Sequence, residues 1–96
     1  MFDKIKQFME MKKQAEQIKR ELDGLTLESQ EINGIKIIID GSMNLKSIEI
    51  DQHFLQAEGK DKLEADIVRS VNAAVKKSQN LAAQKMKEFL PGLPGF

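Results

Sequence analysis

The hydrophobic positions of this chain follow two different periods, one in the middle of the sequence and another on either side of it. β-Branched residues concentrate between Ile35 and Asp51, where isoleucines stand at alternate positions, as in strands with one buried face. Over residues 3–22 and 60–89, apolar residues recur every three or four positions, and neither glycine nor proline interrupts them. That spacing is typical of amphipathic helices. The chain therefore predicts a small sheet with a helix at each end.

The first turn of the sheet is predicted at Asn33-Gly34, a dipeptide that favours a tight hairpin. A two-residue loop would put Leu27 on the face away from the alternating isoleucines, whereas a three-residue loop would place it opposite Ile39. Because the buried face fixes the register, we prefer the three-residue loop, with Gly34 in the left-handed conformation. Ile38 then points to the opposite face, either as a single tolerated apolar residue or as a contact in a dimer.

These elements define an α+β fold in a single domain that covers residues 1–96. A helix over 1–22 is followed by a three-stranded antiparallel sheet over 25–51, a long helix over 60–89 and a tail over 90–96. The second helix is about 45 Å long, whereas strands of this length span about 17–24 Å. Part of this helix must therefore project or pack on another subunit.

The first helix carries a narrow apolar seam that needs one partner helix, either the second helix or a helix of a second copy. With 96 residues and 41% apolar content, the chain is also near the lower end of the sizes that hold a single core. Oligomerisation is a common remedy, so we expect a homodimer with projecting helices. The seam consists of Phe8, Met11, Ala15, Ile18 and Leu22.

Few residues could carry catalysis or hold a metal or cofactor. The chain has one histidine and no cysteine, tryptophan or tyrosine. It contains neither of the glycine-rich phosphate loops GxxxxGK[ST] and GxGxxG, nor an HExxH or EF-hand metal motif. Asp51 and His53 could be imagined as a base and its orienting group, but no nucleophile accompanies them, so a loop at the end of a strand is the preferred interpretation. We expect no enzyme activity, no cofactor and no metal. Without a long apolar run, no membrane contact is expected either.

Charge is distributed unevenly although the net charge is zero. Residues 1–22 hold six basic and four acidic side chains, residues 23–59 hold two and seven, and residues 60–96 hold seven and four. Between Ile67 and Lys87 there are five basic residues and no acidic one, so these lysines lack acidic partners one helical turn away. Such residues often form only a solvated face. Their segregation to the helices instead suggests a surface that meets a polyanion.

The order of these elements resembles the YbaB/EbfC family of bacterial nucleoid-associated proteins. The resemblance rests on Asn33-Gly34 before the isoleucine strand and on Gly41 in the next turn. Its remaining motifs are Ile48-Glu49-Ile50-Asp51, Asp61-x-Leu63-Glu64-x-Asp66-Ile67-Val68, Val71-Asn72-x-Ala74 and Leu90-Pro91-Gly92. The family implies a homodimer in which sheets join and helices stand out like the arms of tweezers. It also implies binding to double-stranded DNA in the cytoplasm and association with the nucleoid, without enzyme activity.

Together, the charges and the resemblance predict a homodimer that binds duplex DNA mainly by phosphate contacts. Because no aromatic residue is interleaved with the cations, stacking on single-stranded bases is not expected. The alternative is an adaptor that docks a partner helix on the apolar seam and uses its lysines for solubility. The candidate DNA-binding residues are Lys12, Lys13, Lys19, Arg20, Arg69, Lys76, Lys77, Lys85 and Lys87.

Overall fold

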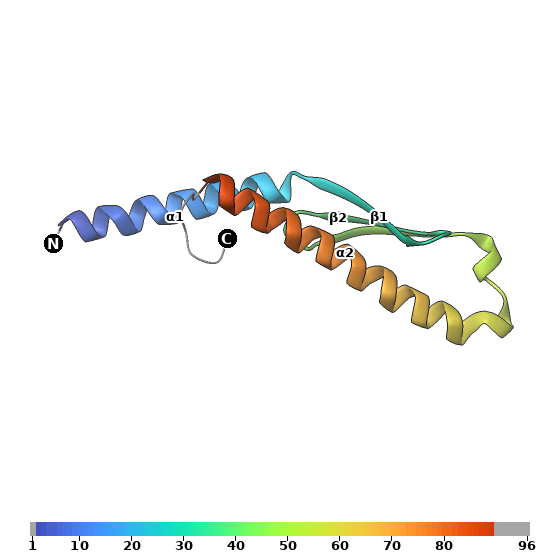
Figure 1. Cartoon of the computed structure of the whole chain (residues 1–96). Coiled ribbons are helices and arrows are strands. Elements are labelled where there is room, and N and C mark those ends of the chain that lie inside the picture. The colour runs from blue at the N-terminus through green and yellow to red at the C-terminus, as the bar shows by residue number, and fades with distance from the viewer. Residues whose placement is uncertain (1, 90–96) are drawn as a thin grey trace.

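A computed structural model describes residues 2–89 of the chain. The predicted order, helix, three strands and long helix, is confirmed (Figure 1), while the predicted tail over 90–96 lies outside the described residues. The main elements are α1 (Phe2–Asp23), β1 (Thr26–Ile32), β2 (Ile35–Asp40), β3 (Leu45–Ile50) and α2 (Lys60–Phe89). Two short 3-10 turns, η1 (Gln52–Phe54) and η2 (Ala57–Gly59), connect β3 to α2.

The strands form one antiparallel sheet in the order β1-β2-β3. Leu27 stands opposite Ile39 and Ser29 stands opposite Ile37, so the predicted register between β1 and β2 is confirmed. Because successive side chains of a strand point to opposite faces, this register places Leu27 on the same face as the alternating isoleucines of β2.

The hairpin loop itself is shorter than the sequence suggested. Ile32 pairs with Ile35, which leaves a two-residue loop, and the prediction of three residues was wrong. A bulge between Ser29 and Ile32 restores the apolar register by adding one residue to β1. Gly34 has a φ of 95°, so its predicted left-handed conformation is confirmed.

The core lies between the sheet and α2, which packs across β1 and β2 (Figure 1). The side chains of alternate β2 residues are fully buried there, while Phe54 of η1 packs against the edge of the same cluster. Leu55, the next residue, is 68% exposed and lies outside the core. The fully buried residues of this cluster are Ile35, Ile37, Ile39 and Ala74.

The third strand is the uncovered edge of the sheet. Ile48 stands opposite Ile37 and Ile50 opposite Ile35, so the two β3 isoleucines share the face of the sheet that carries the buried isoleucines of β2. Nevertheless, Leu45 and Ile48 are 45% and 43% exposed. The apolar face of the sheet therefore continues beyond the part that α2 covers.

Asp40 organises the turn between β2 and β3. Its carboxylate, almost fully buried, accepts hydrogen bonds from the backbone of Ser42 at 2.8 Å and of Asn44 at 2.9 Å. The bond from the Asn44 backbone contributes most to lowering the pKa of Asp40 below its usual value, and the bond from the Ser42 backbone acts in the same direction. Ser78 of α2 completes the turn, because its hydroxyl donates to the Asp40 carbonyl at 2.9 Å and accepts from the Met43 backbone at 3.1 Å.

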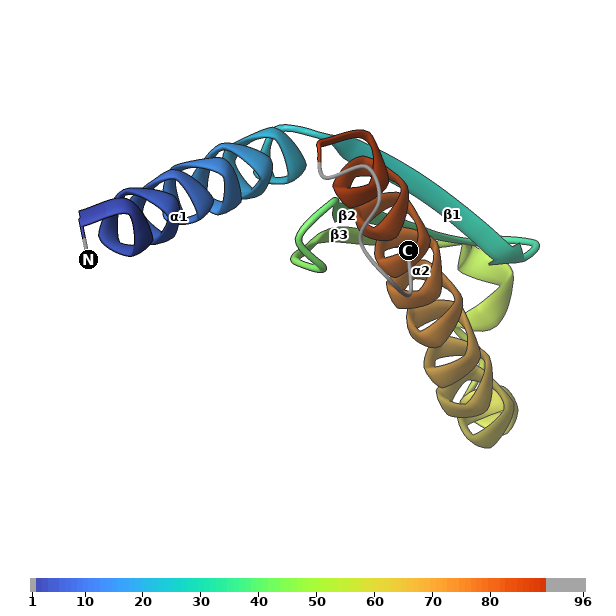
Figure 2. The ribbon, with the colours of Figure 1, turned by 60° about the vertical axis from the view of Figure 1, so that its left-hand side comes forward.

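The same turn holds the end of α1. The backbone N–H of Gly41 donates to the carbonyls of Leu22 at 2.9 Å and Leu25 at 3.2 Å, and the Ser42 hydroxyl donates to the Asp23 carboxylate. From this point α1 runs away from the sheet, as Figure 2 shows. The direction of α1 therefore depends on a close backbone contact at Gly41.

Replacing Gly41 with alanine should destabilise the protein and loosen α1. A Cβ at this position would lie 2.7 Å from the Leu22 carbonyl oxygen and 3.0 Å from the Leu22 Cα, so the backbone must shift. We expect a loss of about 1–3 kcal/mol in the free energy of unfolding, measured by urea denaturation. Gly24→Ala is the matched control, because the nearest atoms to its Cβ are 3.6 Å away. Equal losses in both variants would contradict this account.

Candidate nucleic-acid interface

Three of the candidate cations form a row on the outer side of α2. Arg69, Lys76 and Lys87 are separated by seven and eleven residues, close to two and three turns of an α-helix, so they share one face. All three are exposed, whereas the buried Ala74 and Ser78 lie on the sheet side of the helix. The row spans about 27 Å along α2. It presents positive charge to solvent without an acidic residue between its ends.

Two other candidates on α2 point elsewhere. The Lys77 ammonium donates a hydrogen bond to the backbone carbonyl of Glu28 in β1. Lys85 is half-buried and lies 3.5 Å from the Glu88 carboxylate. The structure therefore separates Lys77 and Lys85 from the outer row, although all the α2 candidates looked alike in the sequence.

Arg69, at one end of the row, has a weak partner of its own. Its guanidinium lies 3.4 Å from the Glu31 carboxylate, and both side chains are largely open to solvent. Exposed ion pairs of this kind contribute little to stability. A phosphate group could therefore replace the carboxylate at small cost, and a guanidinium can bind a phosphate through two hydrogen bonds.

The candidates on α1 form two further rows. Lys12 and Lys19 are seven residues apart, as are Lys13 and Arg20, and each pair shares one face of the helix. All four side chains are exposed. Within residues 2–89, none of them forms an ion pair with a carboxylate. Their positive charge is therefore not neutralised by an ion pair, although Glu16 lies between Lys13 and Lys19 in the sequence.

The lysines of the sheet, in contrast, are paired. The Lys36 ammonium of β2 lies 3.0 Å from the Glu28 carboxylate of β1 and 3.2 Å from the Glu49 carboxylate of β3. The hydrogen bond to Glu28, and after it the one to Glu49, raises the pKa of Lys36. Lys46 lies 3.6 Å from Asp40. The acidic middle of the sequence thus neutralises its own cations, and the positive surface that the sequence predicted belongs to the helices.

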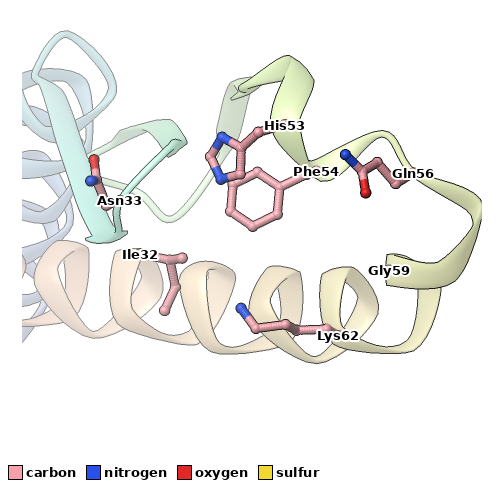
Figure 3. A pocket seen from close by; sticks show the side chains of 7 residues that line it. All are labelled: Ile32, Asn33, His53, Phe54, Gln56, Gly59 and Lys62. Carbon is pink, nitrogen blue, oxygen red and sulfur yellow. The ribbon is translucent and has the colours of Figure 1, made fainter.

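A cavity of about 400 Å³ lies at the other end of the molecule, between the β1-β2 hairpin and the start of α2 (Figure 3). The rings of His53 and Phe54 lie above α2 with their centres 4.1 Å apart and their planes tilted by 36°, and the Lys62 ammonium stands 6.0 Å from the centre of the Phe54 ring. Lys62 also pairs with Asp66 at 3.1 Å. The lining residues are Ile32, Asn33, His53, Phe54, Gln56, Gly59 and Lys62.

Asp51 and His53 meet beside this cavity in a local turn. The Asp51 carboxylate caps η1 by accepting a hydrogen bond from the His53 backbone at 3.3 Å, and this bond is the main reason that the pKa of Asp51 is lowered. The His53 Nδ1 lies 3.4 Å from the same carboxylate oxygen. No hydroxyl or thiol lines the cavity. The pair is therefore explained by the turn, as the sequence favoured.

One cation that extends the outer row was not among the residues predicted from the sequence. Lys62 precedes Arg69 by the same seven residues that separate Arg69 from Lys76, so it continues the row toward the start of α2. Helical spacing was the signal that could have found it. Its ion pair with Asp66 distinguishes Lys62 from Lys76, which has no such partner among residues 2–89.

Two negative findings complete the description of residues 2–89. No group of three or more histidine, aspartate or glutamate side chains in that range is arranged to hold a metal ion. None of the helices in the range has the length and apolar character needed to span a bilayer.

Comparison with known proteins places this arrangement in context. Residues 1–93 match the model of the YbaB/EbfC DNA-binding family. A nucleoid-associated protein of Pelotomaculum thermopropionicum is 32% identical over 95 residues, which cover 93% of this chain and 90% of that protein. Another from Roseiflexus castenholzii is 32% identical over 89 residues, covering 91% and 89%. An uncharacterized protein of Mycoplasma pneumoniae is 42% identical over 62 residues, but the match covers only 65% of this chain and 62% of that protein.

Proposed function

Because the chain belongs to the YbaB/EbfC DNA-binding family, we propose that it binds double-stranded DNA as a homodimer, mainly through phosphate contacts from its basic helices. The observation that carries this proposal is the outer row of α2, where Arg69, Lys76 and Lys87 face solvent with no acidic residue between them in the sequence. The row spans about 27 Å, close to one turn of duplex DNA at about 34 Å. The exposed cations of α1 would supply further phosphate contacts.

Recognition of the phosphate backbone, rather than of bases, follows from the residue types. Two of the three row cations, and Lys62, which extends the row, are lysines. Lysines act on phosphates as point charges and carry no sequence information there. Between Arg69 and Lys87 the sequence has no aromatic residue that could stack on a base. We therefore expect the protein to bind duplexes of different sequence with similar affinity.

The homodimer is supported by the uncovered edge of the sheet. Leu45 and Ile48 leave part of the apolar face in solvent, and the outer edge of β3 has no neighbouring strand in the described chain. Exposed strand edges of this kind favour pairing with another chain. Joining two sheets there would leave the helices projecting from a common body. Each dimer would then present two outer rows of cations to DNA.

The relatives named as nucleoid-associated proteins support a location at the nucleoid, in the cytoplasm, and a role in binding rather than in catalysis. The adaptor hypothesis differs in its expected chemistry. A partner helix docked on an apolar seam would bind with little dependence on salt, because few charges would be neutralised.

Replacing Lys76 with glutamine should weaken DNA binding while leaving the fold intact. At about 100 mM salt each phosphate contact contributes on the order of tenfold to affinity, so losing one contact per protomer should weaken the dimer about a hundredfold. The measurement is fluorescence anisotropy with a random-sequence duplex, with the mass in solution checked alongside. Lys60→Gln is the matched control, because it removes the same charge from α2 on a different face, where Lys60 pairs with Glu64.

The unmodified protein tests whether DNA is bound at all, and the two variants test whether the outer row binds it. No binding of the unmodified protein to duplex DNA at about 50 mM salt would exclude the proposed function. Normal binding by both variants would mean that α2 does not present its outer row to DNA. Equal weakening of both would indicate that the total charge, and not the row, determines affinity.

A further inference from the structure

The cavity between the β1-β2 hairpin and the start of α2 plays no part in the phosphate contacts proposed above. Its volume of about 400 Å³ lies within the range that is usual for small-ligand sites, about 300–1,000 Å³. The rings of His53 and Phe54 line one side of it, and Ile32 and the side chain of Lys62 lie on the opposite side (Figure 3). The cavity therefore has two largely apolar walls that face each other.

Two amide side chains stand at opposite ends of this cavity. Asn33 lies at the hairpin, and Gln56 lies just before η2, as Figure 3 shows. Each amide group carries both hydrogen-bond donors and an acceptor. A ligand between the apolar walls would therefore find polar partners at its edges.

The basic groups beside the cavity already face carboxylates. The Lys62 ammonium lies 3.1 Å from the Asp66 carboxylate, and the His53 Nδ1 lies 3.4 Å from the Asp51 carboxylate. A small free anion in the cavity would meet these negative charges, which reduces its attraction to the basic groups. The cavity is thus better suited to an uncharged ring than to an anion.

The hairpin holds the two aromatic rings in place. A Cβ at Gly34 would lie 2.8 Å from the His53 Cε1 and 2.8 Å from the Phe54 Cε2, so both rings rest against the backbone of the turn. The Asp51 backbone N–H also donates to the Gly34 carbonyl at 2.8 Å. Because the fold itself fixes this wall, a ligand would pay little to order it.

The cavity lies at one end of the outer row of α2. Lys62 belongs to both, because it lines the cavity and precedes Arg69 by seven residues, or about two helical turns. DNA whose phosphates follow the row would therefore bring its backbone to the mouth of the cavity. The sequence did not reveal this arrangement, since Phe54 precedes α2 and is brought beside Lys62 by the fold.

We propose that this cavity receives one unpaired nucleobase of bound DNA. The inference rests on the proposed function, because the cations of the outer row would hold the DNA. A base is uncharged and planar, its faces stack on aromatic rings, and its edges carry hydrogen-bond donors and acceptors. It therefore matches both the walls and the two amides. An unpaired base leaves the duplex at less cost than a paired base, so DNA with an unpaired base should be preferred.

Two duplexes that differ by one extra unpaired adenine test the proposal by fluorescence anisotropy. The unmodified protein should bind the duplex with the unpaired base at least about fivefold more tightly, because one stacked base contributes about this much or more. Gly59→Leu should lose the preference and bind the fully paired duplex as before. Gly59 lines the cavity, and the nearest atom to its Cβ would be 3.9 Å away, so a leucine has room to fill the space.

Ala57→Leu is the matched control. It adds an apolar side chain to the same turn, η2, at an exposed position that does not line the cavity, and it should keep the preference. His53→Ala is a second variant, which removes part of the aromatic wall without touching the core and should weaken the preference. Unchanged affinity for the paired duplex shows in each case that the variant is folded.

The other outcomes of the titrations would overturn the proposal. Equal affinity of the unmodified protein for the two duplexes would mean that no base is bound, and a preference that survives in Gly59→Leu would place the base elsewhere. Loss of the preference in Ala57→Leu as well would assign it to the η2 turn and not to the cavity. Failure of the proposed function itself would look different, because neither duplex would then be bound.

NMR locates the base directly. His53 is the only histidine in the chain, so its ring protons give one set of signals. These signals should shift when the duplex with the unpaired base is added, because an aromatic base enters beside the ring, and they should stay unchanged with the paired duplex. Equal shifts with both duplexes would contradict the proposal. An equal shift with free adenosine at the same concentration would make the cavity a site for free nucleosides and would also overturn it.

Discussion

Raising the salt concentration from about 50 to about 200 mM is expected to weaken the binding of this protein to duplex DNA about a thousandfold. In the proposed homodimer, the outer row of α2 supplies Arg69, Lys76 and Lys87 from each protomer, so the dimer would neutralise about six phosphates. Each neutralised phosphate releases counterions and contributes about −0.9 to the slope of log affinity against log salt. Since the net charge of the chain is zero, this dependence would come from the local cations of the helices and not from an overall positive charge.

Two further titrations determine whether the row causes the salt dependence. The Lys76→Gln dimer should show a slope that is shallower by about two, because each protomer loses one phosphate contact. Lys60→Gln should retain the original slope. A slope near zero in the unmodified protein would contradict phosphate recognition and favour the adaptor hypothesis.

Replacing Ile37 with alanine is expected to remove a large part of the stability of the fold. Ile37 is fully buried in the cluster under α2. The alanine variant therefore buries less apolar surface on folding and leaves a cavity in the core. Substitutions of this kind cost about 2–5 kcal/mol, against a total of about 5–15 kcal/mol for a domain. The free energy of unfolding, measured by urea denaturation at a fixed protein concentration, should fall by about 3 kcal/mol.

The neighbouring isoleucine is the control for this prediction. Ile38 lies on the opposite face of β2 and is only partly buried, so Ile38→Ala should cost less than about 1.5 kcal/mol. The same variant addresses the alternative left open by the sequence. If Ile38→Ala lowers the mass of the protein in solution from dimer to monomer, this face is a dimer contact. Equal losses for Ile37→Ala and Ile38→Ala at constant mass would contradict the core described for this sheet.

The sequence predicted those parts of the fold that depend on periodic burial. Leu27 and Ile39 were aligned correctly because a strand register that buries one apolar face leaves few choices. The length of the hairpin loop was wrong because a bulge between Ser29 and Ile32 changes the residue count without changing that face. Nothing in the residue types at these positions marks a bulge.

The candidate site was predictable in composition but not in detail. The segregation of cations to the helices was visible, and helical phase could have separated Lys76 from its neighbour. The actual position of Lys77 depends on a carbonyl group of Glu28, 49 residues away in the sequence, and a backbone acceptor leaves no pattern in the residues. Likewise, the direction of α1 follows from the contact of Gly41 with Leu22, which no periodicity encodes.

The bond between the β2-β3 turn and Ser78 of α2 has a consequence for biosynthesis. Asp40 and Met43 leave the ribosome well before Ser78, yet the hydroxyl of Ser78 binds the backbone of both in the finished fold. The isoleucines of β2 likewise wait for α2 to cover them. A nascent chain can form α1 and the first hairpin early, but the sheet acquires these stabilising contacts only after α2 has been translated. The sheet therefore remains without its covering layer during the synthesis of the roughly 20 residues that separate β3 from the middle of α2.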